Sequence, residues 1–242
     1  MDPSDYQIRS CGEKDCKDNG KRNLDEEIRV RLSLYYPGWE SPDGTHMVPR
    51  TFIPKAKNPA LQKGDKTEKD FFDILTAFCE KKEPMFVIHS YKFSEYIPIW
   101  ESGKPNTNTS NWVMGEHDFV IVHHVHGVVF FQVKATETSG GHQQAEHQTA
   151  KDKLSLEIFA QKLVKAGITT KNQVRKIFKK FPAFVVLPNT QRGQSAHAKD
   201  HILYQEDCTD KEAFAKWWKD KFQDSEHSSK INQTIYEHLV MR

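Results

Sequence analysis

Two apolar runs joined by a short histidine-rich turn constrain the fold of this chain more than any other feature. Residues 118–122 and 128–133 are rich in β-branched and aromatic side chains, as strands prefer, and Gly127 ends the turn between them. Apolar residues fall on both faces of each run, so we expect a hairpin in the middle of a sheet that is covered on both sides. The hairpin therefore predicts an α/β fold with a central mixed sheet flanked by helices.

The remaining patterns place further elements around this hairpin. Alternation predicts a strand at 28–34, and a polar loop is expected across 94–111. Thr67 is the expected N-cap of a helix whose buried stripe includes Phe71 and Phe78. The other expected elements are strands at 85–89, 184–187 and 201–204 and helices at 142–166, 170–180, 210–222 and 229–240.

The overall charge says little about a polyanionic partner. The 242 residues include 35 basic and 33 acidic side chains, a net charge of +2, so any nucleic-acid surface must be local. Basic residues gather at the end of the 142–166 helix and beyond it, where they form either a phosphate-binding ridge or a solvated helical face. They are Lys162, Lys165, Lys171, Arg175, Lys176, Lys179 and Lys180.

The sequence has the features of an intracellular protein. No stretch approaches the roughly 18 consecutive apolar residues of a membrane span, and the N-terminus lacks a basic region followed by an apolar run. The four cysteines are too few and too scattered for a disulfide framework. Cys11 and Cys16 resemble half a zinc site, but no second pair follows, so free thiols are the preferred interpretation. We therefore expect location in the cytoplasm or nucleus, without secretion and without a membrane partner.

Three polar residues are expected to converge at one end of the hairpin. Gln132 and Lys134 project from the same face because the side-chain period of a strand is two, and antiparallel pairing brings Asp118 opposite to them. Such groups are costly to bury in central strands unless they are paired or bind a metal. The pattern favours a functional site, and a plain cross-strand ion pair between Asp118 and Lys134 is the simpler alternative.

These residue types suit metal-assisted hydrolysis of a phosphodiester. The anionic substrate repels hydroxide, so hydrolysis requires a hard divalent cation, Mg²⁺ or Mn²⁺, held by oxygen ligands. Asp118 is the expected central ligand, joined by the amide oxygen of Gln132 and the backbone carbonyl of Val133. Lys134 is the expected catalytic lysine, which positions the attacking water and stabilises charge in the transition state.

Glu68 is a fourth candidate metal ligand. It shares a helical stripe with Phe71, Phe72 and Leu75, so it is expected to face the sheet. A helix-dipole or capping role in the first turn explains the same position equally well.

The sequence around these residues resembles a known family. Gly-Glu-His-Asp-Phe at 115–119, followed by Val-Phe-Phe-Gln-Val-Lys-Ala at 129–135, is similar to the PD-(D/E)xK nuclease superfamily and most similar to its Mrr-like and nuclease-related-domain (NERD) branches. The order of helix, strand, hairpin, helix and strand also matches, over about residues 66–190. The resemblance implies a restriction-endonuclease-like core, an acidic ligand from the preceding helix, which fits Glu68, and a dimer in many members.

On this interpretation the chain has three parts. Residues 1–27 are expected to form a flexible arm, 28–65 an N-terminal extension and linker, and 66–242 a nuclease-like domain with its core at 66–190 and C-terminal helices at 205–242. The leading hypothesis is a metal-dependent nuclease that acts on DNA rather than RNA. The alternatives are an inactive nuclease-fold module that binds nucleic acid or protein, and a sensor or effector domain that depends on neighbouring domains of a longer chain.

Two positions depart from the superfamily pattern. Gln132 stands where an acidic residue is usual, which removes a negative charge and should weaken cation binding, although Mrr-like members use glutamine there. His117 stands in place of the proline that commonly precedes the aspartate. Gln132 is also the feature that favours the inactive module.

Two further groups are candidates for binding. His123, His124 and His126 crowd the hairpin turn and suggest zinc, but a solvent-exposed histidine cluster is the preferred interpretation. On the helix after the hairpin, the candidates for nucleic-acid contacts are Gln144, Gln148 and Lys151.

Overall fold

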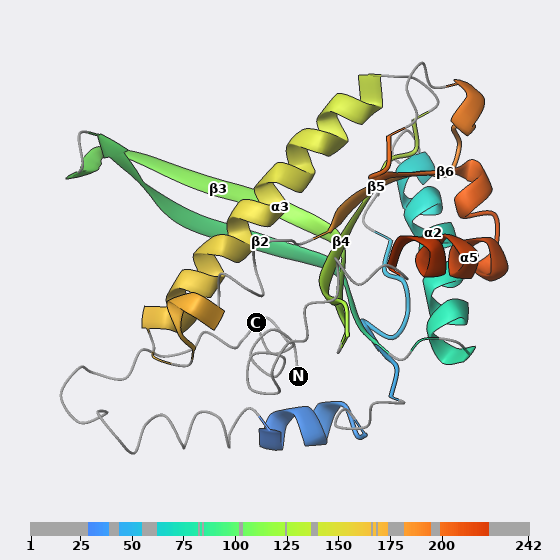
Figure 1. The fold of residues 1–242 in the computed structure, drawn as a ribbon, viewed down its shortest axis with the longest axis horizontal. Helices are drawn as coiled ribbons and strands as arrows, with labels where there is room; N and C mark the ends of the chain where they lie inside the picture. Colours follow the sequence, from blue (N-terminus) through green and yellow to red (C-terminus); the bar gives the residue numbers. More distant parts are fainter. Residues whose placement is uncertain are drawn as a thin grey trace.

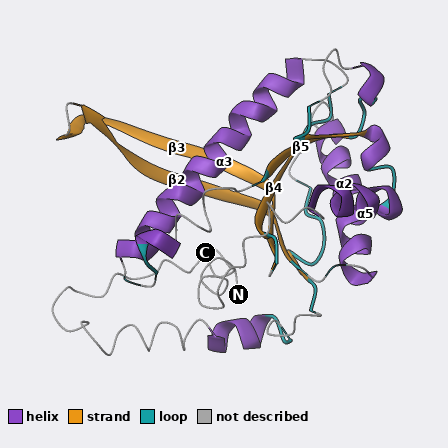
Figure 2. Ribbon diagram, viewed as in Figure 1, coloured by secondary structure: helices purple, strands orange, loops and turns teal. Residues whose placement is uncertain are grey.

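The described part of the chain is built on one mixed β-sheet with helices packed against it (Figure 1 and Figure 2). This computed structural model describes residues 29–38, 44–54, 62–81, 83, 85–101, 104–123, 125–136, 140–165, 167, 169–173, 182–194 and 199–222. Its strands are β1 (His46–Val48), β2 (Phe86–Glu101), β3 (Lys104–His123), β4 (Gly127–Val133), β5 (Ala183–Leu187) and β6 (Ile202–Tyr204). Its longer helices are α2 (Gln62–Lys81), α3 (Gly140–Lys165) and α5 (Lys211–Phe222), and short 3₁₀ helices cover Arg192–Gln194 and Gln205–Asp207.

The sheet confirms the α/β prediction. Its six strands lie in the order β1-β2-β3-β4-β5-β6. The strands β2, β3 and β4 pair antiparallel, β1 runs parallel to β2, and β5 and β6 continue parallel to β4. The predicted hairpin is therefore β3–β4, in the centre of the sheet, and every residue of β4 is buried.

Helices cover the two faces of the sheet. On one face α2 and α5 pack together, and the ring of Phe71 lies 5.3 Å from Phe119, 5.4 Å from Phe131 and 5.7 Å from Phe214. The core on this face is made of aromatic and aliphatic side chains from α2, α5 and alternate residues of the central strands. On the other face α3 crosses β2, β3, β4 and β5 (Figure 1).

The N-terminal strand prediction was wrong. Residues 29–35 are helical, with Leu32 buried and Val30 and Leu34 exposed on the surface. Apolar residues at positions 30, 32 and 34 fit strand alternation, but positions 30 and 34 also share a helical face. The first strand among the described residues is instead β1, whose Met47 aligns with Val87 of β2.

Two other local predictions need correction. Thr67 is not an N-cap, because α2 begins at Gln62 and the Thr67 hydroxyl donates a hydrogen bond of 2.8 Å to the Lys63 carbonyl one turn earlier. The segment 94–111 is not a loop, because the backbones of β2 and β3 pair as a long ribbon through it, with a register shift between Pro98 and Ile99. Long-range strand pairing has overridden a composition rich in Asn, Thr, Ser and Pro.

The later elements follow the predictions. The helix expected at 142–166 is α3, and it ends just before Gly167, which has a positive φ of 67°. The strands at 184–187 and 201–204 and the helix at 210–222 correspond to β5, β6 and α5. The predicted arm at 1–27, most of the 170–180 helix and the 229–240 helix lie outside the described residues. None of the described helices combines the length and apolar character needed to cross a lipid bilayer.

Candidate active site at the end of the hairpin

Asp118 sits where the pairing of β3 and β4 ends. The last paired residues are Phe119 and Phe131, and beyond them the Asp118 carboxylate accepts a hydrogen bond of 2.8 Å from the backbone N–H of Val133. In a continued ladder that N–H would be directed at the β3 backbone. The side chain of Asp118 therefore replaces a backbone acceptor at the point where the two strands separate.

Gln132 meets the same carboxylate oxygen. Its Nε2 donates to Asp118 Oδ2 at 2.5 Å, and both residues are almost fully buried, with exposed fractions of 3% and 5%. The flanking residues of Gln132 on β4, Phe131 and Val133, belong to the α2–α5 core, so Gln132 faces the α3 side of the sheet. The predicted convergence of Asp118 and Gln132 is confirmed.

The oxygen atoms at this point are of the types that bind a hard divalent cation. The Oε1 atom of Gln132 is buried and accepts no hydrogen bond from any described residue, which is a costly state for an amide oxygen unless a donor or cation is bound. The carbonyl of Val133 points toward β3, as its N–H does, because both groups of a strand residue face the same neighbour. A carboxylate, an amide oxygen and a backbone carbonyl are the oxygen ligands that Mg²⁺ and Mn²⁺ prefer.

Lys134 follows directly after β4. Its backbone N–H donates a hydrogen bond of 3.0 Å to the Val186 carbonyl, which holds it in line with the parallel β4–β5 pair. The side chain is half-buried, and strand alternation places it on the same face as Gln132. The backbone register thus brings Lys134 to the Asp118 end of the hairpin, and the convergence of its side chain with Asp118 and Gln132 stays a prediction.

Glu68 faces the sheet as expected but lies on the other side of it. It projects from α2, and its carboxylate is 3.5 Å from Nε2 of the buried His89. The His89 ring packs 4.8 Å from Phe119 and 5.7 Å from Phe72, within the α2 face, whereas Gln132 faces α3. Sequence analysis missed His89, although a histidine that ends an apolar strand run was the available signal.

The candidate nucleic-acid contacts lie on α3. Gln148 Nε2 donates a hydrogen bond of 3.2 Å to the backbone carbonyl of Glu116, two residues before Asp118. This contact holds β3 against α3 beside the candidate site. Gln144 and Lys151 belong to the same helix, and their side chains lie outside the described part of the structure.

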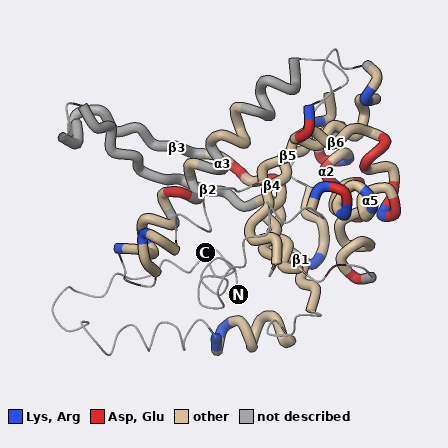
Figure 3. Tube along the Cα trace, viewed as in Figure 1, with Lys and Arg blue, Asp and Glu red and all other residues tan. Residues whose placement is uncertain are grey.

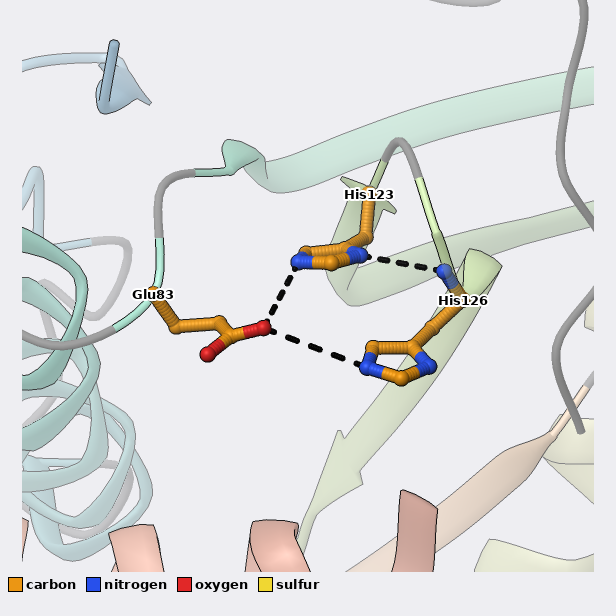
Figure 4. A group of neighbouring side chains, drawn as sticks. All are labelled: Glu83, His123 and His126. Atoms are coloured by element: carbon orange, nitrogen blue, oxygen red, sulfur yellow. Dashed lines mark hydrogen bonds and ion pairs between the residues drawn. The ribbon is translucent and has the colours of Figure 1, made fainter. Parts of the chain in front are cut away.

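A second cluster of polar side chains lies at the opposite end of the hairpin (Figure 4). It consists of Glu83, His123 and His126. One Glu83 oxygen is 3.0 Å from His123 Nε2 and 3.9 Å from His126 Nε2, and the two imidazole rings stack with centroids 4.6 Å apart. The prediction of a solvent-exposed cluster was wrong for His123, which is only 4% exposed. His124 lies outside the described residues.

The hydrogen bonds of His123 determine its tautomer. Nδ1 accepts from the backbone N–H groups of Val125 at 3.1 Å and His126 at 3.0 Å, so it carries no proton. The proton of the neutral ring is therefore on Nε2 and points at Glu83. This hydrogen bond is the main cause that lowers the pKa of Glu83 from its ordinary value.

That tautomer disfavours zinc at this cluster. A metal-bound histidine coordinates through one nitrogen and normally donates the N–H of the other to an acceptor. A metal on His123 Nε2 would displace the proton from that nitrogen, and a neutral ring would then have to carry it on Nδ1. Nδ1 faces two N–H donors, so a proton there would have no acceptor. The atoms of the three side chains lie within 4.8 Å of one another, but their hydrogen bonding fits a structural contact better.

The described surface carries both signs of charge. Acidic and basic positions are interspersed around α5 and β6 (Figure 3), and α5 itself contains Lys216, Lys219, Asp220 and Lys221. Of the basic residues proposed as a ridge, Lys162, Lys165 and Lys171 are exposed, and Arg175, Lys176, Lys179 and Lys180 lie outside the described part. Comparison with protein-family models, curated proteins and solved structures finds no match for this chain.

Proposed function

We propose that this protein is a divalent-metal-dependent nuclease with a restriction-endonuclease-like core, acting on DNA. One observation carries the proposal: the buried Asp118 carboxylate lies against Gln132, whose Oε1 is buried and accepts no hydrogen bond among the described residues. A buried carboxylate beside an unsatisfied amide oxygen is unfavourable in a purely structural core. A cation held by Asp118 and, after rotation of the amide, by Gln132 Oε1 would account for the unsatisfied oxygen.

The proposal gives each residue a separate task. Asp118, the Oε1 of Gln132 and the carbonyl of Val133 would hold Mg²⁺ or Mn²⁺. When bound, such an ion would neutralise phosphodiester charge and lower the pKa of a water molecule. Lys134 would hold that water and the scissile phosphate through its ammonium group, which donates hydrogen bonds to anionic oxygens. The proposal gives Glu68 no ligand role, because its carboxylate lies 3.5 Å from His89 Nε2 on the α2 side of the sheet.

A second candidate function is an inactive module that retains the fold for binding. The observation that favours it is the Gln132 amide, which donates to Asp118 at 2.5 Å and so satisfies the carboxylate without an ion. Calorimetric titration with Mn²⁺ separates the candidates. Asp118-dependent binding at millimolar metal supports the nuclease, and absence of binding supports the module.

Activity on DNA tests the leading proposal directly. Wild-type protein is expected to cleave DNA with Mg²⁺ or Mn²⁺ and to lose all cleavage in EDTA. Lys134→Ala should reduce the rate by about a hundredfold or more, because one stabilising group in the transition state is commonly worth that much. Circular dichroism should show that the variant is folded.

The matched control is Lys219→Ala, which removes an exposed lysine from α5. This variant should cleave like the wild type. Undiminished cleavage by Lys134→Ala would contradict the proposed role of Lys134, and cleavage that persists in EDTA would contradict metal dependence.

A further inference from the structure

We propose that His123, Glu83 and the turn residues Val125 and His126 form an acid-sensitive latch. In the latch, a second proton on the His123 ring releases the turn from its hydrogen bonds while the ring stays bound to Glu83. This inference is independent of the proposed nuclease activity, because it uses the end of the hairpin away from Asp118.

The hydrogen bonds of the closed latch depend on the lone pair of His123 Nδ1. Backbone N–H groups can only donate, so the bonds from Val125 and His126 to His123 Nδ1 require an unprotonated nitrogen. The two bonds pin the backbone of the turn to the ring that precedes it. A proton on Nδ1 would convert the acceptor into a donor that faces two other donors, and both bonds would be lost.

The other ring nitrogen behaves in the opposite way. Nε2 already carries its proton and lies 3.0 Å from a Glu83 oxygen, with the His123 side chain only 5% exposed. An imidazolium ring binds a carboxylate more strongly than a neutral ring does. Acid should therefore leave the ring on Glu83 and free the turn, rather than release the whole cluster.

The charged groups beside Glu83 and His126 come from three elements. Glu83 follows α2, His126 belongs to the turn, and α5 contributes Lys216 and Lys219. Together with aromatic residues these groups line a cleft of about 510 Å³. The nearby thiol of Cys79 stays neutral, because burial raises its pKa above the ordinary value.

Release of the turn would also change the packing of α5. The His126 ring packs 4.7 Å from Phe222 and 5.8 Å from Trp218, and its backbone N–H is one of the two groups that the latch holds. When that bond is lost, the contact between the hairpin turn and α5 loses its fixed geometry. The latch therefore couples proton binding to the packing of α5 against the sheet.

Amide hydrogen exchange in the full chain tests the latch. NMR would follow the Val125 and His126 amides from about pH 8 to about pH 5, which spans the titration range of histidine, with rates corrected for intrinsic exchange. Their protection should fall by about tenfold per pH unit once the ring takes up its second proton, since one proton is linked to opening. Nitrogen chemical shifts should report the Nε2–H tautomer of His123 at the upper end of the range.

Two variants make the result specific. His123→Asn retains a side-chain oxygen that can accept from the turn but does not titrate, so its protection should not depend on pH. His126→Phe keeps both the backbone N–H and an aromatic ring against Phe222, and it should retain the pH dependence. Constant protection in the wild type, equal loss in His123→Asn, or an Nδ1–H tautomer would each overturn the latch.

Discussion

Gln132 decides which chemistry the candidate site can support. Its amide presents a donor to Asp118 and leaves its own oxygen without a hydrogen bond from the described residues. A glutamate at this position would supply a second carboxylate to a cation. The same glutamate would face Asp118 with like charge when no cation is bound.

Replacement of Gln132 by glutamate should strengthen metal binding but lower the stability of the metal-free protein. Gln132→Glu should bind Mn²⁺ at least about tenfold more tightly than the wild type, because a carboxylate ligand adds charge to the site. In EDTA it should unfold more easily, by about 1–3 kcal/mol, because the donor to Asp118 is lost. Calorimetry measures the first effect and urea denaturation the second. Tighter metal binding without any loss in EDTA would mean that Asp118 and residue 132 do not interact.

Glu83 makes a contribution to stability that depends on pH. The hydrogen bond from His123 is the largest of the effects that lower the pKa of Glu83 in the folded protein, and burial opposes them. The unfolded chain therefore takes up the proton at higher pH than the folded one. The contribution is complete above the ordinary value of 4.5 and is lost as pH falls through the lowered pKa.

Glu83→Gln should remove this contribution. At neutral pH the variant should be less stable than the wild type by about 1 kcal/mol, the usual net value of one hydrogen bond. The difference should disappear in acid below the carboxylate range. Urea denaturation at several pH values measures it, and Glu80→Gln, which changes an exposed residue of α2, is the control. A gap between wild type and Glu83→Gln that is the same in acid would argue against ionisation as its source.

At the scale of elements, one side chain ties α3 to β3. Gln148 donates to the Glu116 carbonyl, so Gln148→Ala should lower stability by about 1 kcal/mol because that carbonyl loses a donor. If Gln148 instead acts mainly on nucleic acid, the variant would keep its stability and lose affinity for DNA. Thermal denaturation and a binding assay on the same preparation distinguish the two roles.

How far the elements were predictable depended on whether their pattern was local. The β3–β4 hairpin was predictable because β-branched runs and Gly127 specify strands and turn within a few residues. The ribbon at 94–111 was not, because its strands are formed by pairing across the hairpin rather than by propensity. The helix at 29–35 was mistaken for a strand because seven residues fit both periods.

The same distinction applies to the candidate site. Asp118 and Gln132 could be brought together from register alone, because both belong to one hairpin. Register alone could not predict that Glu68 pairs with His89 or that Glu83 pairs with His123. Each of these contacts joins α2, or the residues just after it, to a strand by tertiary packing. Residue type suggested a role for Glu68, but only packing decides which face of the sheet it reaches.

At the scale of the whole molecule, two thiols are sealed inside the fold. Cys79 and Cys208 are buried, and burial raises the pKa of Cys208 to about 12. In a variant with Cys11 and Cys16 replaced by serine, the folded protein should react with a disulfide reagent at least about a hundredfold more slowly than the urea-unfolded protein, because the thiolate is the reacting form. Absorbance of the released thiol measures the rate. Rapid reaction without denaturant would show that this core opens readily.

The long β2–β3 ribbon has open strand edges that favour self-association, and prolines in its backbone oppose it. Apart from their pairing with each other, residues 89–101 of β2 and 104–118 of β3 pair with no other described strand, and such edges are templates for stacking between molecules. Pro98 lies in β2 and Pro105 in β3, and a proline offers no amide hydrogen to an incoming chain. Each strand of the ribbon therefore lacks one amide donor, which works against stacking between molecules.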